Sequence, residues 1–227
     1  PGLPPDLAGA GRGHVQAEIA LDAERMGRLR ASCGVSDFCL LLGALSLAVT
    51  QTTAAQAPSI TVPFALSRPG GAGAVGYHTH PVPLAVALPD SASFGDLCRA
   101  WAHTIGNVGQ RLEAGLLPYP ASGPRQISAV HLDAQPGLGP ALAQLALGLE
   151  PGVLRLGGYE LSNEVAQLRD PEMPLQLTSC GSGASLRAVL RMDHGFSAAT
   201  VASLARRMAD TLARAAGSDR LSLAALR

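Results

Sequence analysis

The sequence has 227 residues, and its 17 basic and 17 acidic side chains give a formal net charge of zero. No run of like charge forms a patch that could follow phosphates or anionic lipid, which argues against nucleic acid and membrane surfaces as partners. No segment reaches the roughly 18 uninterrupted apolar residues that a membrane span needs. The cysteines show no CxxC spacing, so we expect reduced thiols in a soluble, cytoplasmic protein.

The first elements are predicted from hydrophobic periodicity and helix caps. Alternating apolar residues predict a strand over residues 14–22. Asp22 is expected to cap a helix that ends near Cys33. Ser36 is expected to cap a second helix, which is apolar on nearly every side and should therefore be buried.

The middle of the chain continues the alternation of strands and helices. Two strands are predicted over residues 59–67 and about 77–88, joined by a glycine-rich turn. Ser93 is expected to cap a third helix with one apolar face. A further strand is predicted over residues 126–134.

Residues 136–170 are ambiguous between a poor helix and an irregular linker. The following stretch predicts a hairpin whose turn is GSGAS (181–185), and then a closing helix capped by Ser197. The expected buried stripe of that helix is Ala198, Val201, Leu204, Ala205, Met208 and Leu212. The predicted fold class is α/β of the α+β type, with helices packed on one face of a mostly antiparallel mixed sheet.

His78 and His80 lie two residues apart in a predicted strand, so both side chains would point to one face and could reach one metal ion. A metal site needs a third and a fourth ligand, and the nearest acids, Asp90 and Asp96, stand at no diagnostic spacing. We therefore interpret the two histidines as polar positions on a half-exposed strand and predict no metal site.

His194 lies in the segment DHGFS, between a predicted strand and a predicted helix, which is a suitable place for a general base. Such a base needs an orienting partner, and Asp193 would point to the opposite face of the strand. We therefore interpret His194 as a turn residue. His14, His103 and His131 stand alone and are expected to be exposed or hydrogen-bonded structural residues. Neither a GxSxG elbow nor a P-loop is present.

The order of these segments resembles the C-terminal lobe of the condensation domains of nonribosomal peptide synthetases, which belong to the chloramphenicol-acetyltransferase-like superfamily. LPPD (3–6) is similar to the segment between the two lobes, and LLPYP (116–120) resembles a Pro-Phe-Glu loop that has lost its acid. AVGYHTHPVPLAV (74–86) falls on the family's Ile-Gly-x-Phe-Val-Asn-Thr-x-x-x-Arg motif. Gly76 matches the start of that motif, and His80 stands at its asparagine.

The resemblance implies that Gly76, Tyr77, His78 and His80 are remnants of a motif that lines a tunnel. The family's His-His-x-x-x-Asp-Gly motif, whose second histidine assists attack of an amine on a thioester, belongs to the N-terminal lobe and occurs nowhere in this sequence. Because amide formation needs both positioning and proton transfer, we expect no catalytic residue and no enzymatic activity from this chain by itself.

The resemblance also implies a domain organisation and a set of partners. Residues 1–13 would form a linker between the lobes, residues 14–216 the lobe, and residues 217–227 a linker toward a downstream adenylation domain. The implied role is a non-catalytic scaffold that forms the acceptor-side half of the tunnel and a platform for neighbouring domains. Its partners would be the adenylation domain and carrier protein of one assembly line, and a missing N-terminal lobe. No cofactor is expected, because a carrier's phosphopantetheine would be a visiting substrate arm.

Two alternatives stay open. The first is a free-standing trimeric acyltransferase that uses CoA or a carrier thioester with His194. Its motif, Asp-His-Arg-x-x-Asp-Gly, is matched by MDHGFSAA only in the Asp-His. The second is an interaction module that binds a carrier protein or a tailoring enzyme. A large exposed apolar face would favour the scaffold or the interaction module over the acyltransferase.

Overall fold

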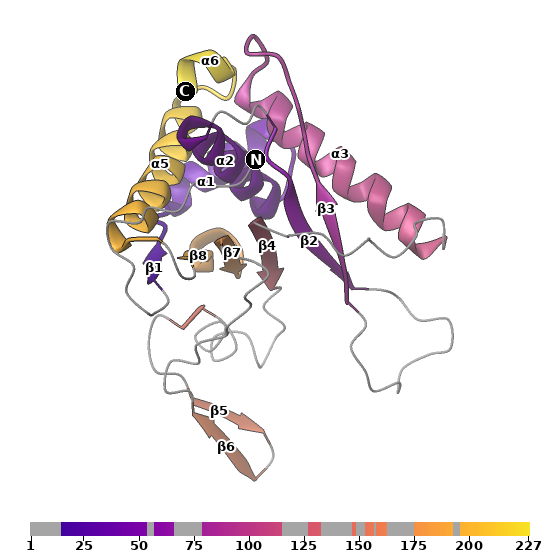
Figure 1. The fold of residues 1–227 in the computed structure, drawn as a ribbon, viewed down its shortest axis with the longest axis vertical. Coiled ribbons are helices and arrows are strands. Elements are labelled where there is room, and N and C mark those ends of the chain that lie inside the picture. Colours follow the sequence, from indigo (N-terminus) through magenta and orange to yellow (C-terminus); the bar gives the residue numbers. More distant parts are fainter. Residues whose placement is uncertain are drawn as a thin grey trace.

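The structure is a computed structural model that describes residues 15–53, 57–65, 79–114, 127–132, 147–148, 153–156, 158–162, 175–192 and 196–227. Figure 1 shows the arrangement of its elements. In chain order these are β1 (Val15–Glu18), α1 (Ala23–Cys33), α2 (Asp37–Thr52), β2 (Ile60–Ala65), β3 (Thr79–Leu84), α3 (Phe94–Glu113), β4 (Ile127–Leu132), β5 (Val153–Leu156), β6 (Tyr159–Ser162), β7 (Leu175–Cys180), the 3₁₀ turn η2 (Gly183–Ser185), β8 (Arg187–Met192), α5 (Ala198–Gly217) and α6 (Leu223–Leu226).

The main sheet has six strands in the order β1-β8-β7-β4-β2-β3. The two central pairings, β7 with β4 and β4 with β2, are parallel, whereas the three outer pairings are antiparallel. Strands β5 and β6 form a separate antiparallel hairpin, which lies apart from the main sheet (Figure 1). The expected mixed sheet, mostly antiparallel, is therefore confirmed.

The helices cover one face of this sheet (Figure 1). In each strand, alternate residues such as Ala17, Leu190, Leu177, Ala129 and Val62 belong to the same hydrophobic core as α2 and α5. Helix α2 is buried almost throughout, as its uniformly apolar sequence predicts. The core therefore lies between the helix layer and one face of the sheet.

The helix caps predicted from the sequence are confirmed. The side chains of Asp22, Ser36, Ser93 and Ser197 each accept a hydrogen bond from the backbone N–H three residues later. Each cap satisfies a donor that the first turn of a helix leaves without an intrahelical partner. In α5 the predicted buried stripe is correct except for Ala198, which is exposed because it is the first helical residue.

The described strands are shorter than the hydrophobic patterns suggested. Strand β1 ends at Glu18 rather than near residue 22, and β3 ends at Leu84 rather than near residue 88. The ambiguous stretch 136–170 contains the hairpin β5–β6, which we did not predict. The predicted hairpin at residues 175–192 is confirmed, with η2 inside its turn.

The segment predicted as a linker, residues 217–227, packs against the lobe as far as Arg227. Leu223 and Leu226 are 2% and 1% exposed, and α6 lies next to the ends of α2 and α5 (Figure 1). Its continuation toward an adenylation domain stays a prediction, as does the linker over residues 1–13, which lies outside the described residues.

None of the described helices is by itself long and apolar enough to cross a membrane. Helices α1 and α2 reach that length and composition only when taken together, across a bend of 97°.

Candidate functional site

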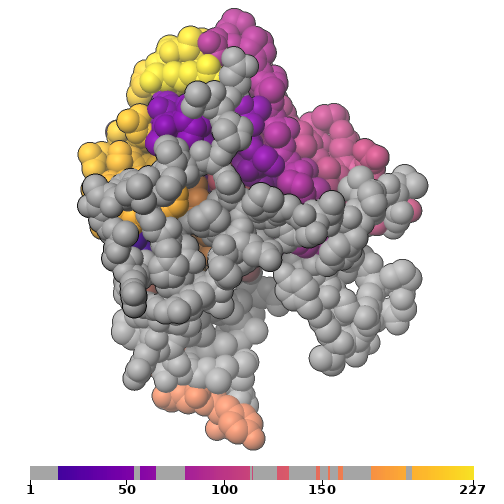
Figure 2. Space-filling view, viewed as in Figure 1, coloured from indigo at the N-terminus to yellow at the C-terminus, as the bar shows by residue number. Residues whose placement is uncertain are grey.

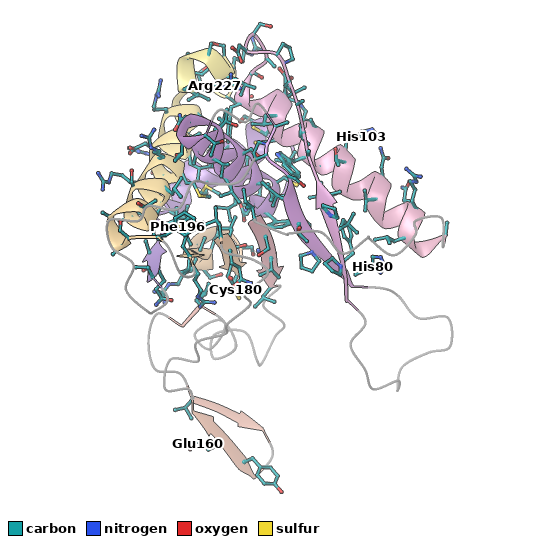
Figure 3. The ribbon with its side chains drawn as sticks, in the orientation of Figure 1. His80, His103, Glu160, Cys180, Phe196 and Arg227 are labelled. Atoms are coloured by element: carbon teal, nitrogen blue, oxygen red, sulfur yellow. The ribbon has the colours of Figure 1, made fainter. Side chains whose placement is uncertain are left out.

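His80 is the one residue of the predicted tunnel motif that the structure describes, since Gly76, Tyr77 and His78 lie outside the described residues. It pairs with Phe64 across β2 and β3, so the two side chains share the helix-covered face of the sheet. Figure 3 shows it at the end of this strand pair that lies far from α6. At 7% exposed it is buried, so the expectation of a half-exposed strand position is wrong for His80.

His194, the catalytic residue of the acyltransferase alternative, also lies outside the described residues, as does His14. His103 is exposed on α3, where its Nε2 lies 2.9 Å from Asn107 Nδ2. His103 therefore fits the expected role of a hydrogen-bonded surface residue. Among the described residues, no group of three or more His, Cys, Asp or Glu side chains could hold a metal ion.

His131 connects β4 to its neighbours at the carboxyl ends of the central strands. Its Nδ1 lies 2.9 Å from Ser179 Oγ on β7, and its ring stacks on Phe38 of α2 with the ring centroids 5.7 Å apart. Ser179 is 0% exposed and also donates to Val130 O at 3.3 Å. Since a buried hydroxyl in a structural bond cannot reach a substrate, this Ser–His pair is a packing feature rather than a nucleophile and its base.

Asp37 joins three elements next to this pair. Its Oδ2 accepts from Arg30 Nη1 at 3.1 Å and from the backbone N–H of Gly183 at 3.2 Å. The carboxylate is 5% exposed, so it ties the end of α1, the start of α2 and the β7–β8 turn together inside the protein. The sequence gives only a weak signal for it, an acid in the first turn of a helix.

The face of the sheet that the helices do not cover carries a line of polar side chains. Five residues on five successive strands are in register with one another. They are Gln16, Arg191, Gln176, Ser128 and Thr61, and we call them the polar row. Sequence reasoning missed this row because each member is an ordinary outward position of its own strand, and only the strand order aligns them.

The polar row passes from a partly exposed end to a buried one. At β1, Arg191 Nε donates to Gln16 Oε1 at 3.4 Å, and Gln16 Nε2 donates to Gly148 O at 2.9 Å. Burial lowers the pKa of the Arg191 guanidinium from its usual value. At the other end, Thr61 and Ser128 are 3% and 5% exposed.

Two buried hydroxyls on this face make no hydrogen bond. They belong to Ser128 and to Thr178, which is 3% exposed and lies one step further along β7. Buried polar groups are normally satisfied by protein, water or ligand. The face opposite the helices thus carries polar side chains beside a small buried apolar cluster of Leu147, Cys180 and Val189, whereas the face under the helices belongs to the main hydrophobic core.

The described cysteines are buried free thiols. Burial raises the pKa of Cys33 and Cys39, and it raises the pKa of Cys98 well above the usual range. Because the thiolate is the reactive form, these groups behave as small apolar side chains and not as nucleophiles.

No protein-family model matches this sequence, and no curated protein does. Solved structures do match it. A complex of the X-domain and OxyB from teicoplanin biosynthesis has a TM-score of 0.70 and 18% identity, over 100% of this chain and 50% of that chain. The first condensation domain of the calcium-dependent antibiotic synthetase has a TM-score of 0.60 and 18% identity, over 95% and 47%. The condensation domain from the monacolin K polyketide synthase has a TM-score of 0.65 and 13% identity, over 98% and 54%.

This chain thus spans about half the length of each of these three chains. The similarity in fold extends over 95–100% of this chain. The chain therefore has the fold of a single lobe of a condensation domain, which is a chloramphenicol-acetyltransferase-like fold.

Proposed function

We propose that this chain is the C-terminal half of a condensation-type domain of a nonribosomal peptide synthetase and is not a catalyst by itself. The observation that carries the proposal is the coverage, since 94–100% of this chain matches 47–54% of single condensation domains and X-domains. The order of motifs along the sequence supports the C-terminal half. A half of this kind would work together with a first lobe that supplies the missing His-His-x-x-x-Asp-Gly motif.

The side chains of the described residues are consistent with a supporting role. Amide formation from a thioester needs a positioned group that accepts the proton of the attacking amine. His103 is on the outer surface, and His131 is held between Ser179 and Phe38. His80 is buried on the helix side of the sheet. None of these three described histidines lies on the sheet face that carries the polar row, where a substrate could pass between two lobes.

Within this proposal the partly exposed end of the polar row, formed by Gln16, Arg191 and Gln176, lines the acceptor side of the tunnel. Its support is chemical, because these three residues offer amide and guanidinium groups on the sheet face opposite α2 and α5. The partners would be a first lobe, a carrier protein and an adenylation domain. A similar four-domain nonribosomal peptide synthetase, solved bound to AMP and glycine, matches this chain with a TM-score of 0.69 and 12% identity, over 97% of this chain and 18% of that one.

The test combines solution mass with a transfer assay. We expect the purified chain to be a monomer or weak dimer by light scattering, and to transfer no acyl group from a carrier thioester or from acyl-CoA to an amine. His194→Ala and His131→Ala serve as matched variants, and neither should change this result. A trimer whose transfer activity is lost in His194→Ala and kept in His131→Ala would overturn the proposal in favour of a free-standing acyltransferase.

The similarity to the X-domain favours a second candidate, an interaction module for a carrier protein or a tailoring enzyme. The complex of that X-domain with OxyB gives a TM-score of 0.70 over the whole of this chain. Large exposed apolar side chains among the described residues are Val153 and Tyr159, both on the β5–β6 hairpin, so a broad exposed apolar face is not seen in the described part of the chain. Calorimetric titration with a carrier protein, with and without its phosphopantetheine arm, tests this candidate, and saturable binding without transfer would support it.

A further inference from the structure

Ser93 and Ser222 lie opposite each other in an isolated antiparallel bridge. Each of them is also the N-cap of a helix, α3 for Ser93 and α6 for Ser222. Figure 2 shows the C-terminal segment in yellow against the indigo and purple atoms of α2 and the magenta atoms of the region that leads into α3. Two helix starts that are far apart in the sequence therefore meet back to back.

The backbone bonds between these two helix starts are reciprocal. The first two N–H groups of α3, those of Phe94 and Gly95, donate to Leu221 O and Asp219 O at 3.1 Å each. The first two N–H groups of α6, those of Leu223 and Ala224, donate to Ala92 O at 2.8 Å and Asp90 O at 3.1 Å. The first N–H groups of a helix have no intrahelical partner. Here each segment supplies the acceptors that the other one lacks.

Side chains also fix the C-terminal segment to the rest of the protein. Leu223 and Leu226 are buried in the main core. Gln51 of α2 donates to Leu226 O at 2.7 Å, and Arg214 of α5 donates to Ala225 O and Leu226 O at the end of α6. An ion pair joins Arg227 to Asp90. The C-terminal segment is thus bonded to α2 and α5, and to the segment that precedes α3.

We propose that residues 90–97 and 218–227 form one cooperative unit, which we call the clasp, and that the clasp opens and closes as a whole. The clasp is a conformational device, because it couples the position of the C-terminal segment to the order of the first turn of α3. Any load or binding partner that displaces the C-terminal segment would loosen the start of α3 as well. This inference does not depend on the proposed function.

The physical reason for cooperativity is the cost of orphaned donors. If the C-terminal segment leaves, the N–H groups of Phe94 and Gly95 lose their acceptors. The side chain of Phe94, which is 0% exposed in the closed state, lies at the same place. If the first turn of α3 frays, the carbonyls of Ala92 and Asp90 no longer face α6. Because each change removes the acceptors of the first N–H groups of the other helix, either change favours the other.

Native-state amide exchange on the full chain tests the clasp. Leu226→Ala removes a buried side chain of the C-terminal segment and changes no residue of α3. We expect it to speed the exchange of the Leu223 and Ala224 amides by at least about tenfold, and that of the Phe94 and Gly95 amides by a similar factor. The amide of Leu204 in the middle of α5 should still exchange more slowly than these four amides, which separates local opening from global unfolding.

The reciprocal variant starts from the other side. Ser93→Ala removes the cap of α3, and we expect it to speed exchange at Leu223 and Ala224 several-fold although it changes no atom of α6. Arg220→Ala is the matched control, because Arg220 is exposed in the same segment and makes no hydrogen bond or ion pair within the described structure. If Leu226→Ala speeds only the amides of α6, or Ser93→Ala only those of α3, the two segments open independently and the proposal fails.

Discussion

The indole Nε1–H of Trp101 donates a hydrogen bond to Ser46 Oγ at 3.1 Å and so joins α3 to α2 inside the core. Trp101 is 0% exposed and Ser46 is 4% exposed. Ser46 Oγ in turn donates to Leu42 O at 2.8 Å. The Ser46 hydroxyl is therefore the hydrogen-bond acceptor for the one polar atom in the ring of Trp101, which is the single tryptophan of the chain.

Ser46→Ala is expected to lower the free energy of unfolding by about 1–3 kcal/mol, because it leaves the buried indole N–H without an acceptor. Denaturant unfolding followed by Trp101 fluorescence measures the change. Ser128→Ala is the matched control, since that buried hydroxyl has no hydrogen-bond partner to lose. It should change stability by less than about 1 kcal/mol in either direction. Equal losses in the two variants would contradict this account of Ser46.

The β7–β8 turn contains two glycines with positive φ that should respond differently to alanine. Gly181 has φ 79°, and a Cβ there would lie 2.6 Å from Ser185 O; Gly183 has φ 57°, and the nearest atom, Arg30 Nη1, would be 3.9 Å away. Gly183→Ala should cost about 1–2 kcal/mol for the left-handed conformation alone. Gly181→Ala should cost clearly more, because backbone must also move. Thermal unfolding of the two variants gives the order, and a larger loss at Gly183 would refute it.

Asp96 should make stability depend on acid pH. Its pKa is lowered from 3.8 to about 2, first by the hydrogen bond from the Ser93 hydroxyl, then by that from the Ser93 N–H and by Arg99. A carboxylate with a lowered folded-state pKa stabilises the fold above its unfolded-state pKa, and this contribution is lost as pH falls through the folded-state value.

The stability difference between wild type and Asp96→Asn should therefore be constant above about pH 5 and should shrink between about pH 4 and pH 2. Denaturant unfolding across this range measures it. Asp210→Asn, on the exposed face of α5, provides a control for the effect of an Asp-to-Asn substitution on a helix surface. A difference that grows toward pH 2 would have the wrong sign for this mechanism.

The cysteines should be unreactive in the native protein. Cys33, Cys39, Cys98 and Cys180 are all buried, and burial raises the pKa of the first three thiols. A colorimetric thiol reagent at neutral pH should label them slowly in the native chain and label four thiols per chain in denaturant. Fast labelling of one thiol under native conditions would show that its site is open to solvent.

Local features of the fold could be predicted from the sequence because they depend on neighbouring residues. The caps at Asp22 and Ser36 are examples, since a short polar side chain just before a helix accepts a hydrogen bond from the N–H three residues later. The burial of α2 follows from its composition in the same way. The hairpin at 175–192 needs only a glycine-containing turn between two alternating strands.

The candidate site depends on contacts between distant segments, which periodicity does not contain. Nothing near Ser128 indicates that it lies beside Thr61 on one side and Gln176 on the other. His80 looks like a polar position on an edge strand, yet it is buried because it faces the helix layer beside Phe64. The resemblance in sequence was enough to predict the fold. The polar row could be recognised only from the strand order, and the clasp only from the contacts of the C-terminal segment.

The two prolines of β3 decide how this sheet can be extended. Pro81 and Pro83 are two residues apart, so they remove successive N–H donors from the same side of the strand. The other side pairs with β2, so the missing donors face outward. An incoming strand would find acceptors there but hardly any donors, which prevents regular strand addition. A second lobe or partner protein must therefore engage this chain through its faces, its loops or the opposite edge at β1, and cannot continue the sheet beyond β3.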